Sequence, residues 1–459
     1  MNLLEHALAT WMPAQRWFPG DRIGGDVTVI ADTLLTTGDP ELRHLIVSVR
    51  SGASAGPPAH YQVLAGFRRQ MPAELAHAVI GTDQRGKVVY DGLHDSELTT
   101  VLLRAIAGER ADGPLAFARE PDAVIDLTAR SLVLSVEQSN TSLVFGDSAI
   151  LKVFRRLFPG PNPDLEVNSA LARLGSSDIA RPLGSVSSRL DGEPVLLAVL
   201  SEFQRGACDG WQLALTSLRD LYARATDRAG ATADGEGAAA AEAGGDFAGE
   251  AHRLGAATAR VHADLARAFG TQTLDPEELA GLAGQMTLKL KEASAEVSAL
   301  ATFADKVATA YAALAEITSP VTVQRVHGDY HLGQVLRSQS GWVLLDFEGE
   351  PLVPLDRRRD LAPALRDVAG MLRSFDYAAR HLLVGHPDAA RLSGTALEWV
   401  ARNSAAFCEG YAEEHGSDPR DQAILLRALM LDKAVYEVMY EARHRPSWQD
   451  IPLDAIAGL

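Results

Sequence analysis

Cysteine is scarce in this 459-residue chain, and its two cysteines, Cys208 and Cys408, exclude a disulfide framework. Basic residues are also few, because 43 Lys and Arg stand against 60 Asp and Glu, giving a formal charge of −17. This charge argues against a nucleic-acid partner, which would favour a basic surface. No apolar run approaches a membrane span, and residues 1–6 lack the basic start of a signal peptide. We therefore expect a cytoplasmic protein with no nucleic-acid or membrane partner.

Apolar residues, by contrast, make up 47% of the chain, and the length allows two or three domains. Short β-like runs separated by Gly, Pro and Asp fill the first hundred residues, with a helix-like segment at 98–106. Five further apolar runs, from residue 132 to residue 200, predict a five-stranded sheet, and the rest reads as almost wholly helical. The sequence predicts an α+β fold with an N-terminal subdomain over 1–110, a sheet lobe over 111–203 and a helical lobe over 204–459. A flexible low-complexity insertion is expected at about 226–245.

The most informative motif lies in the helical part, where His327-Gly328-Asp329 is followed by Gln334 and, after an apolar strand, by Asp346. In phosphoryl transfer from ATP, one carboxylate accepts the proton of the attacking hydroxyl, while an amide oxygen and a second carboxylate hold Mg²⁺. The kinase catalytic loop has this order, with Asn in the place of the glutamine. A single His-Gly-Asp would indicate no more than a solvated turn. The full spacing predicts Asp329 as the catalytic base, with Gln334 and Asp346 as metal ligands.

The residues that would bind ATP are expected in the sheet lobe. Lys152 interrupts an otherwise apolar strand, which is costly unless its charge is paired. A helix-like segment with Glu166 follows, so we predict the kinase-type pair of a strand lysine and a helix glutamate; an outward-facing edge lysine is the alternative. A polar segment takes the place of a glycine-rich phosphate loop, although an ordinary hairpin turn would look similar. The further candidates for ATP binding are Ser139, Asn140, Thr141 and Ser142 in this segment, and Glu202 and Phe203 after the fifth strand.

A late helix, predicted over 423–444, has aromatic rings and acids at i, i+4 spacings, which places them on neighbouring faces. Aromatic platforms beside hydrogen-bonding acids suit a sugar, whereas core packing or a solvated face is the alternative for any single residue. The candidates for acceptor binding are Asp329, His331, Glu437, Tyr440, Glu441, His444, Trp448 and Asp450.

Together these motifs resemble the maltokinase-like branch of the aminoglycoside phosphotransferase superfamily, over nearly the whole chain. The resemblance implies a protein-kinase-like bilobal fold, with an antiparallel N-lobe sheet, a helical C-lobe and an N-terminal cap subdomain over 1–110. It implies ATP and Mg²⁺ with a sugar acceptor, and we expect a monomer or weak homodimer. The matching segments are 15–18, 137–142, 151–156, 162–164, 209–211, 327–334, 346–351, 366–378 and 436–448.

The chain also departs from the maltokinase pattern, at 19–21, 356–363 and 449–450. Two of these departures add or move an acid near the expected acceptor side. An acceptor with an ammonium group would favour an extra carboxylate, because an unpaired buried charge is costly. The superfamily includes actinobacterial glucosamine kinases that look like maltokinases, so we expect glucosamine to be phosphorylated at its 6-hydroxyl. Maltose phosphorylated at its anomeric hydroxyl, an aminoglycoside acceptor, and a kinase-like binding protein without activity are the alternatives.

Overall fold

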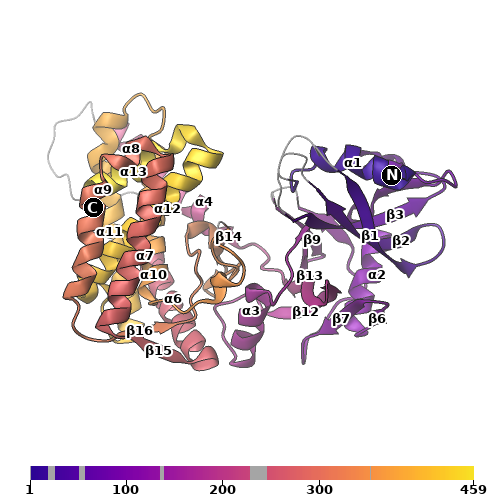
Figure 1. Cartoon of the computed structure of the whole chain (residues 1–459), viewed down its shortest axis with the longest axis horizontal. Coiled ribbons are helices and arrows are strands. Elements are labelled where there is room, and N and C mark those ends of the chain that lie inside the picture. Colours follow the sequence, from indigo (N-terminus) through magenta and orange to yellow (C-terminus); the bar gives the residue numbers. More distant parts are fainter. Residues whose placement is uncertain (1, 19–25, 51–56, 135–138, 228–245, 352) are drawn as a thin grey trace. The chain divides into compact units, whose positions relative to one another are not determined.

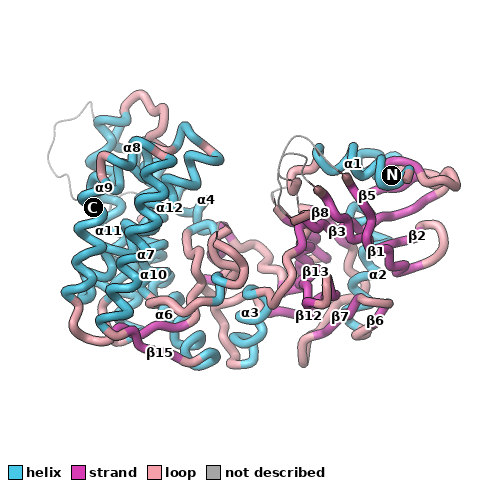
Figure 2. Tube along the Cα trace, in the orientation of Figure 1, coloured by secondary structure: helices cyan, strands magenta, loops and turns pink. Residues whose placement is uncertain are grey.

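The computed structural model describes residues 2–18, 26–50, 57–134, 139–227, 246–351 and 353–459. The chain forms two compact units, one of Met1–Ser169 with Ala180–Arg205 and the other of Ala170–Ile179 with Gly206–Leu459. Strands dominate the first unit and helices the second (Figures 1 and 2), which confirms the predicted α+β class. The predicted boundaries at 110 and 203 stay predictions. Three sequence expectations, at 19–21, at 137–138 and over most of the 226–245 insertion, lie outside the described residues.

The first sheet of the N-terminal unit is antiparallel, as its short β-like runs predicted. Its strands pair in the order β1-β2-β3-β5-β4, and a short strand, β11, also pairs with β3. Apolar side chains point to both faces, so that Leu45 and Val63 pack with helix α1 while Leu42 and Leu64 pack with helix α2. The elements are α1 (Leu3–Trp11), β1 (Val27–Thr36), β2 (Glu41–Val49), β3 (Ala59–Arg68), β4 (Val79–Thr82), β5 (Val88–Asp91), α2 (Ser96–Ala107) and β11 (Arg156–Leu157).

The second sheet of this unit has the strand order β6-β7-β12-β13-β10-β9-β8. The prediction of five strands was wrong, because β6 and β7, of two and five residues, are too short to show a clear pattern and extend the sheet at one edge. The elements are β6 (Ala111–Asp112), β7 (Leu115–Arg119), β8 (Ser131–Val133), β9 (Asn140–Phe145), β10 (Ala149–Phe154), α3 (Pro163–Arg173), β12 (Pro182–Leu190) and β13 (Glu193–Glu202).

A buried glutamine joins the two sheets. The side-chain amide of Gln62, on β3, donates to the carbonyl oxygens of Phe154 and Leu197, each at 2.6 Å. Its own oxygen lies 2.9 Å from Nε2 of His44, and burial lowers the pKa of this imidazole to about 4. The ring is therefore neutral at pH 7, as a buried hydrogen-bonded group should be.

The second unit is a helical assembly with two small antiparallel sheets. Helix α12 has the predicted bounds, 423–444. The helices are α4 (Gly210–Asp227), α6 (Ala248–Phe269), α7 (Pro276–Glu296), α8 (Ser298–Ala301), α9 (Ala304–Ala312), α10 (Leu365–His381), α11 (Ala389–His415), α12 (Ala423–His444) and α13 (Asp450–Gly458). The strands are β14 (Cys208–Asp209), β15 (Thr271–Leu274), β16 (Val321–Gln324), β17 (Val335–Arg337) and β18 (Trp342–Leu344).

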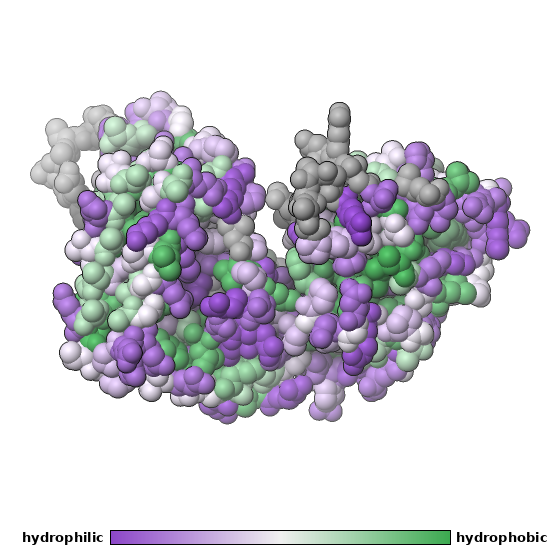
Figure 3. Space-filling model, in the orientation of Figure 1, coloured by the Kyte–Doolittle hydropathy of each residue, from purple (hydrophilic) through white to green (hydrophobic). Residues whose placement is uncertain are grey.

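Hydrophilic and hydrophobic residues are mixed over the visible face of both units (Figure 3). Within the described ranges, no helix is both long enough and apolar enough to cross a membrane. Both cysteines are free, as the sequence predicted.

We expect Gly410→Ala to destabilise the second unit, because its Cβ would lie 1.9 Å from the carbonyl oxygen of His252 where α11 meets α6. Overpacking of this kind costs about 1–3 kcal/mol. The matched control is Gly394→Ala in the same helix, where no neighbour lies within 4 Å of the added Cβ. Alanine favours a helix by about 1 kcal/mol over glycine, so this variant should be stabilised. Thermal unfolding of both variants measures the difference, and an unchanged Tm for Gly410→Ala would contradict the close helix contact.

Candidate active site

The loop between β16 and β17 presents Asp329 at the surface of the second unit. The side chain is 15% exposed, and Gly328 before it has φ +85°, a conformation that favours glycine. The backbone N–H of Asp329 donates to Nδ1 of His327 at 3.4 Å, and Nε2 of that ring lies 2.7 Å from the carbonyl oxygen of Leu345. The ring of His327 therefore bridges the backbone of Asp329 and the backbone of Leu345, the residue before Asp346.

One face of α10 holds this loop in place. The carboxylate of Asp367 accepts hydrogen bonds from the backbone N–H groups of His327 at 2.7 Å and Gly328 at 3.0 Å. Three residues on, a Cβ at Gly370 would lie 2.5 Å from the carbonyl oxygen of Tyr330, so the helix backbone touches the loop. A turn later, Oγ of Ser374 accepts from the backbone N–H of Leu332 at 3.0 Å. Through these contacts Asp367 braces the loop that contains Asp329.

Asp367 is ionised in this position. Burial alone would raise the pKa of its carboxyl, but the hydrogen bond from His262 and the charges and N–H groups around it hold this pKa below its ordinary value. Nε2 of His262 lies 3.0 Å from Oδ2 of Asp367, and its Nδ1 lies 3.0 Å from the hydroxyl of Tyr411. The loop is thus anchored through α10 to α6 and α11.

Lys433, on α12, lies between two carboxylates beside the loop. Its Nζ is 2.9 Å from Oδ1 of Asp329 and 2.9 Å from Oε1 of Glu350. Burial alone would raise the pKa of Asp329, but the ammonium of Lys433 and the ring of His331 hold it well below its ordinary value. Asp329 is therefore an anion at neutral pH, as the acceptor of a hydroxyl proton must be.

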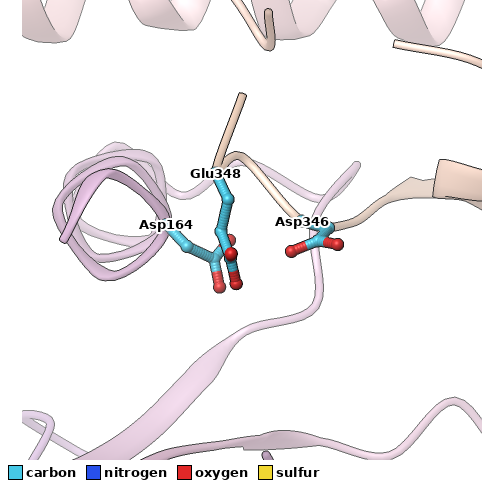
Figure 4. A group of neighbouring side chains, drawn as sticks. All are labelled: Asp164, Asp346 and Glu348. Carbon is cyan, nitrogen blue, oxygen red and sulfur yellow. The ribbon is translucent and has the colours of Figure 1, made fainter. Parts of the chain in front are cut away.

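The predicted metal ligands lie together in the second unit. The side-chain amide of Gln334 is 3.3 Å from Oδ2 of Asp346, and a carboxylate oxygen of Glu348 lies within 4.8 Å of one of Asp346. Figure 4 shows the carboxylates of Asp346 and Glu348 on the loop after β18. Carboxylate and amide oxygens are the ligands that Mg²⁺ prefers, so this donor set fits the predicted ion. Asp346 has φ +66°, a strained conformation of the kind that gathers at functional sites.

A cavity of about 410 Å³ opens beside Asp329. Its lining includes six of the eight residues predicted to bind the acceptor: Asp329, His331, Glu437, Tyr440, Glu441 and Trp448. The other two, His444 and Asp450, do not line it. His444 is exposed and stacks on Tyr440 with ring centroids 4.4 Å apart, while Asp450 is exposed at the start of α13. Their predicted roles stay predictions.

Two acids in the cavity are held by arginines. Oε2 of Glu437 accepts from Nη2 of Arg373 at 2.6 Å, and Arg373 also donates to Asp376 at 2.6 Å. Burial raises the pKa of Glu437 even though the guanidinium of Arg373 opposes the rise. Glu441 accepts from the hydroxyl of Tyr377 at 2.8 Å and from Nη2 of Arg445 at 2.7 Å. The positive charge of Arg373 therefore only partly offsets the effect of burial on the pKa of Glu437.

Aromatic rings form another part of the cavity wall. His381 lies edge-on to Trp448 with ring centroids 4.7 Å apart, and Trp211 lies 5.6 Å from His381 and 6.1 Å from Tyr377. Nδ1 of His381 is buried and has no hydrogen-bond partner in the part of the chain that the structure describes. Ring faces beside an uncommitted polar nitrogen suit a sugar, which has apolar C–H faces and hydroxyl edges.

The residues predicted to bind ATP all lie in the first unit, with Glu166 in the part of α3 that precedes Ala170. Lys152 is in β10, an interior strand between β9 and β13, so the alternative of an edge lysine is wrong. Its Nζ lies 5.3 Å from the ring centroid of Phe154, and its predicted pair with Glu166 stays a prediction.

In the predicted phosphate segment, Ser139 is exposed, Asn140 begins β9, Thr141 accepts from Nε of Arg155 at 2.8 Å, and Ser142 is buried. The backbone N–H groups of Glu202 and Phe203 already donate to the carbonyl oxygens of Arg181 and Ser148.

Several residues of the site were not predicted from the sequence: Lys433, Glu350, Arg373, Trp211, His381 and Arg445. Lys433 stands four residues before Glu437, on the same helix face. Extending the i, i+4 pattern one turn towards the N-terminus would have found it. The others come from segments far apart in the sequence and gave no local signal.

Two family models match this chain, one for the maltokinase N-terminal cap domain at residues 11–95 and one for a phosphotransferase enzyme family at residues 138–395. A glucosamine kinase of Streptacidiphilus jiangxiensis is 33% identical over 330 residues, covering 69% of this chain and 70% of that protein. A glucosamine kinase of Mycolicibacterium smegmatis is 31% identical over 336 residues, covering 71% and 78%. A solved glucosamine kinase in complex with glucosamine, ADP and inorganic phosphate matches with a TM-score of 0.66 and 26% identity, covering 99% of this chain and 98% of that one.

We expect Asp367→Asn to loosen the loop, because an amide N–H₂ would face backbone donors that a carboxylate now accepts. Leaving such a buried group unsatisfied costs about 1–3 kcal/mol. Thermal unfolding should show a lower Tm, and hydrogen exchange should be faster in peptides that contain residues 327–328. Asp220→Asn, the same change at an exposed position of α4, is the control and should alter neither. Equal exchange rates in the two variants would show that Asp367 does not hold the loop.

Proposed function

Because this chain belongs to the phosphotransferase enzyme family and is an ATP-dependent sugar kinase, we propose that it transfers the γ-phosphate of ATP to the 6-hydroxyl of glucosamine. The family membership confirms the resemblance found in the sequence. The observation that carries the choice of acceptor is the acid-lined cavity beside Asp329, in which Glu437 is incompletely compensated by positive charge. The similarity to glucosamine kinases supports the same choice.

The chemistry follows from the geometry around Asp329. Lys433 occupies Oδ1, so Oδ2 is left to accept the proton of the acceptor hydroxyl and to orient its oxygen towards the γ-phosphate. Phosphoryl transfer passes through a loose transition state, in which positioning and charge neutralisation matter more than the strength of the base. Gln334 and Asp346, with Glu348 nearby, would hold Mg²⁺, which neutralises charge on the phosphates when bound.

The remaining nucleotide contacts are assigned to the first unit. We propose that Lys152, paired with Glu166, binds the phosphates, that residues 139–142 lie along them, and that Glu202 and Phe203 contact the adenine. The interior position of Lys152 in its sheet supports the first assignment.

We further propose a cytoplasmic location, because the reaction consumes ATP. We propose a monomer or weak homodimer, because the acceptor cavity is formed within one chain.

The amine of glucosamine, protonated at neutral pH, would complete the charge balance of the cavity. Arg373 divides its donors between Glu437 and Asp376, so Glu437 has capacity for a further cation. An ammonium group placed beside this buried carboxylate would form a charge-assisted hydrogen bond, about twice as strong as a neutral one. A neutral hexose or maltose would leave the carboxylate without that partner, which favours glucosamine over both.

With Mg-ATP, we expect the enzyme to release ADP at least about tenfold faster with glucosamine than with glucose or maltose at equal subsaturating concentration, a difference of about 1.4 kcal/mol.

The variant Asp329→Asn should bind both substrates, but its kcat should be lower by about 10²–10⁴-fold, because the proton acceptor is lost. A coupled ADP assay and a phosphate analysis of the product measure both effects. A preference for maltose would assign the alternative acceptor, and retained turnover in Asp329→Asn would remove this residue from the mechanism.

We expect Glu437→Gln to narrow the preference for glucosamine over glucose by about tenfold or more, because the ammonium loses a buried charged partner. Arg373 keeps Asp376 in this variant, so its own charge stays paired. Glu398→Gln, an identical change on the exposed face of α11, is the control and should leave the ratio of the two kcat/KM values unchanged. An equal loss for both sugars would show that Glu437 shapes the cavity without recognising the amine. In that case Asp450→Asn tests the predicted acid at the departure from the maltokinase pattern.

A further inference from the structure

Lys433 forms the centre of a row of alternating charges. Its ammonium, 14% exposed, lies between Asp329 and Glu350, and Glu350 in turn accepts from Nη2 of Arg366 at 3.0 Å. These residues come from the catalytic loop, the segment after Asp346, α10 and α12. Glu350 alone could pair the charge of a lysine with a purely structural role, whereas Lys433 also contacts Asp329, the proposed base.

The contact fixes the orientation of the Asp329 carboxylate. Lys433 is bonded to Oδ1, while Nε2 of His331 lies 3.9 Å from Oδ2, beyond hydrogen-bond distance. One carboxylate oxygen is therefore held by the protein and the other is left for the acceptor. Rotation of the carboxylate would break the bond to the ammonium, so the bond defines which oxygen faces the hydroxyl.

Lys433 also connects the base to the helix that lines the acceptor cavity. Glu437 is four residues further along α12, and Tyr440 and Glu441 follow on the same side. Because a helix is rigid over two turns, the contact with Asp329 sets the position of the acceptor-binding acids relative to the base. Sites on regular elements keep such distances better than sites on loops.

We propose that Lys433 is a positioning residue for phosphoryl transfer, which orients Asp329 and couples it to acceptor binding on α12. This proposal rests on the proposed function. The charged and titratable groups that face Asp329 are Lys433 from α12 and His327 and His331 from its own loop. Lys433 in turn faces Asp329, Glu350 and the ring of Tyr436, and its charge also acts on Asp432 and Glu437 of its own helix. Lys433 is the strongest of the influences that lower the pKa of Asp329.

The test is the pH dependence of kcat in Lys433→Met and Lys433→Arg. In the wild type, Asp329 stays ionised over pH 5–8, so kcat should show no acidic limb from this group. Without the ammonium, burial raises the pKa of Asp329, so kcat of Lys433→Met should be lowest at pH 5 and rise with pH. At pH 7 we expect a loss of about 10²-fold in kcat, with the KM for glucosamine changed less than about threefold. Lys433→Arg should restore most of kcat and the flat profile.

The variants must be compared as folded proteins, because Lys433→Met leaves two buried carboxylates without their shared cation. The double variant Lys433→Met/Glu350→Gln restores the charge count and should show the same acidic limb. A flat profile in Lys433→Met and in the double variant, or an equal loss at every pH that Lys433→Arg does not rescue, would overturn the proposal and leave Lys433 a structural residue. Failure of the wild type to phosphorylate glucosamine would instead overturn the proposed function, so the two failures are distinct.

Discussion

The candidate site depends on one buried carboxylate, that of Asp367. It accepts hydrogen bonds from the backbone N–H groups of His327, which is buried, and Gly328, which is partly buried, and without it both donors would lose their partner. Gly370 and Ser374 continue the same face of α10 along the loop, so a single helix face defines the path of the chain through Asp329. The contact between Lys433 and Asp329 depends on this position of the loop.

The sequence predicted the parts of the site whose signal is local. The spacing from Asp329 to Gln334 and Asp346 lies within one loop and one strand, so a short stretch of chain contains the geometry. The acceptor face of α12 was predictable for the same reason, because helical periodicity places Glu437 and Tyr440 together once the helix exists.

The parts that were missed depend on contacts between distant segments. Lys433 meets Asp329 across 104 residues and Glu350 across 83, so the helix pattern could have placed it on the acceptor face of α12 but could not have paired it with these carboxylates. The short strand β6 was missed because two residues contain no periodicity. His444 was placed on the acceptor side by the helix pattern and Asp450 by its position just after Trp448; neither lines the cavity, and both roles stay predictions.

The left-handed backbone of Asp346 has a consequence for how its role can be measured. At φ +66°, aspartate and asparagine are tolerated far better than most residues, because their short polar side chains can bond locally. An alanine at this position would change the loop geometry and the charge together, and its effect could not be divided between them. Asparagine keeps the side-chain shape and the backbone preference while removing the negative charge, so the isosteric replacement separates electrostatics from conformation.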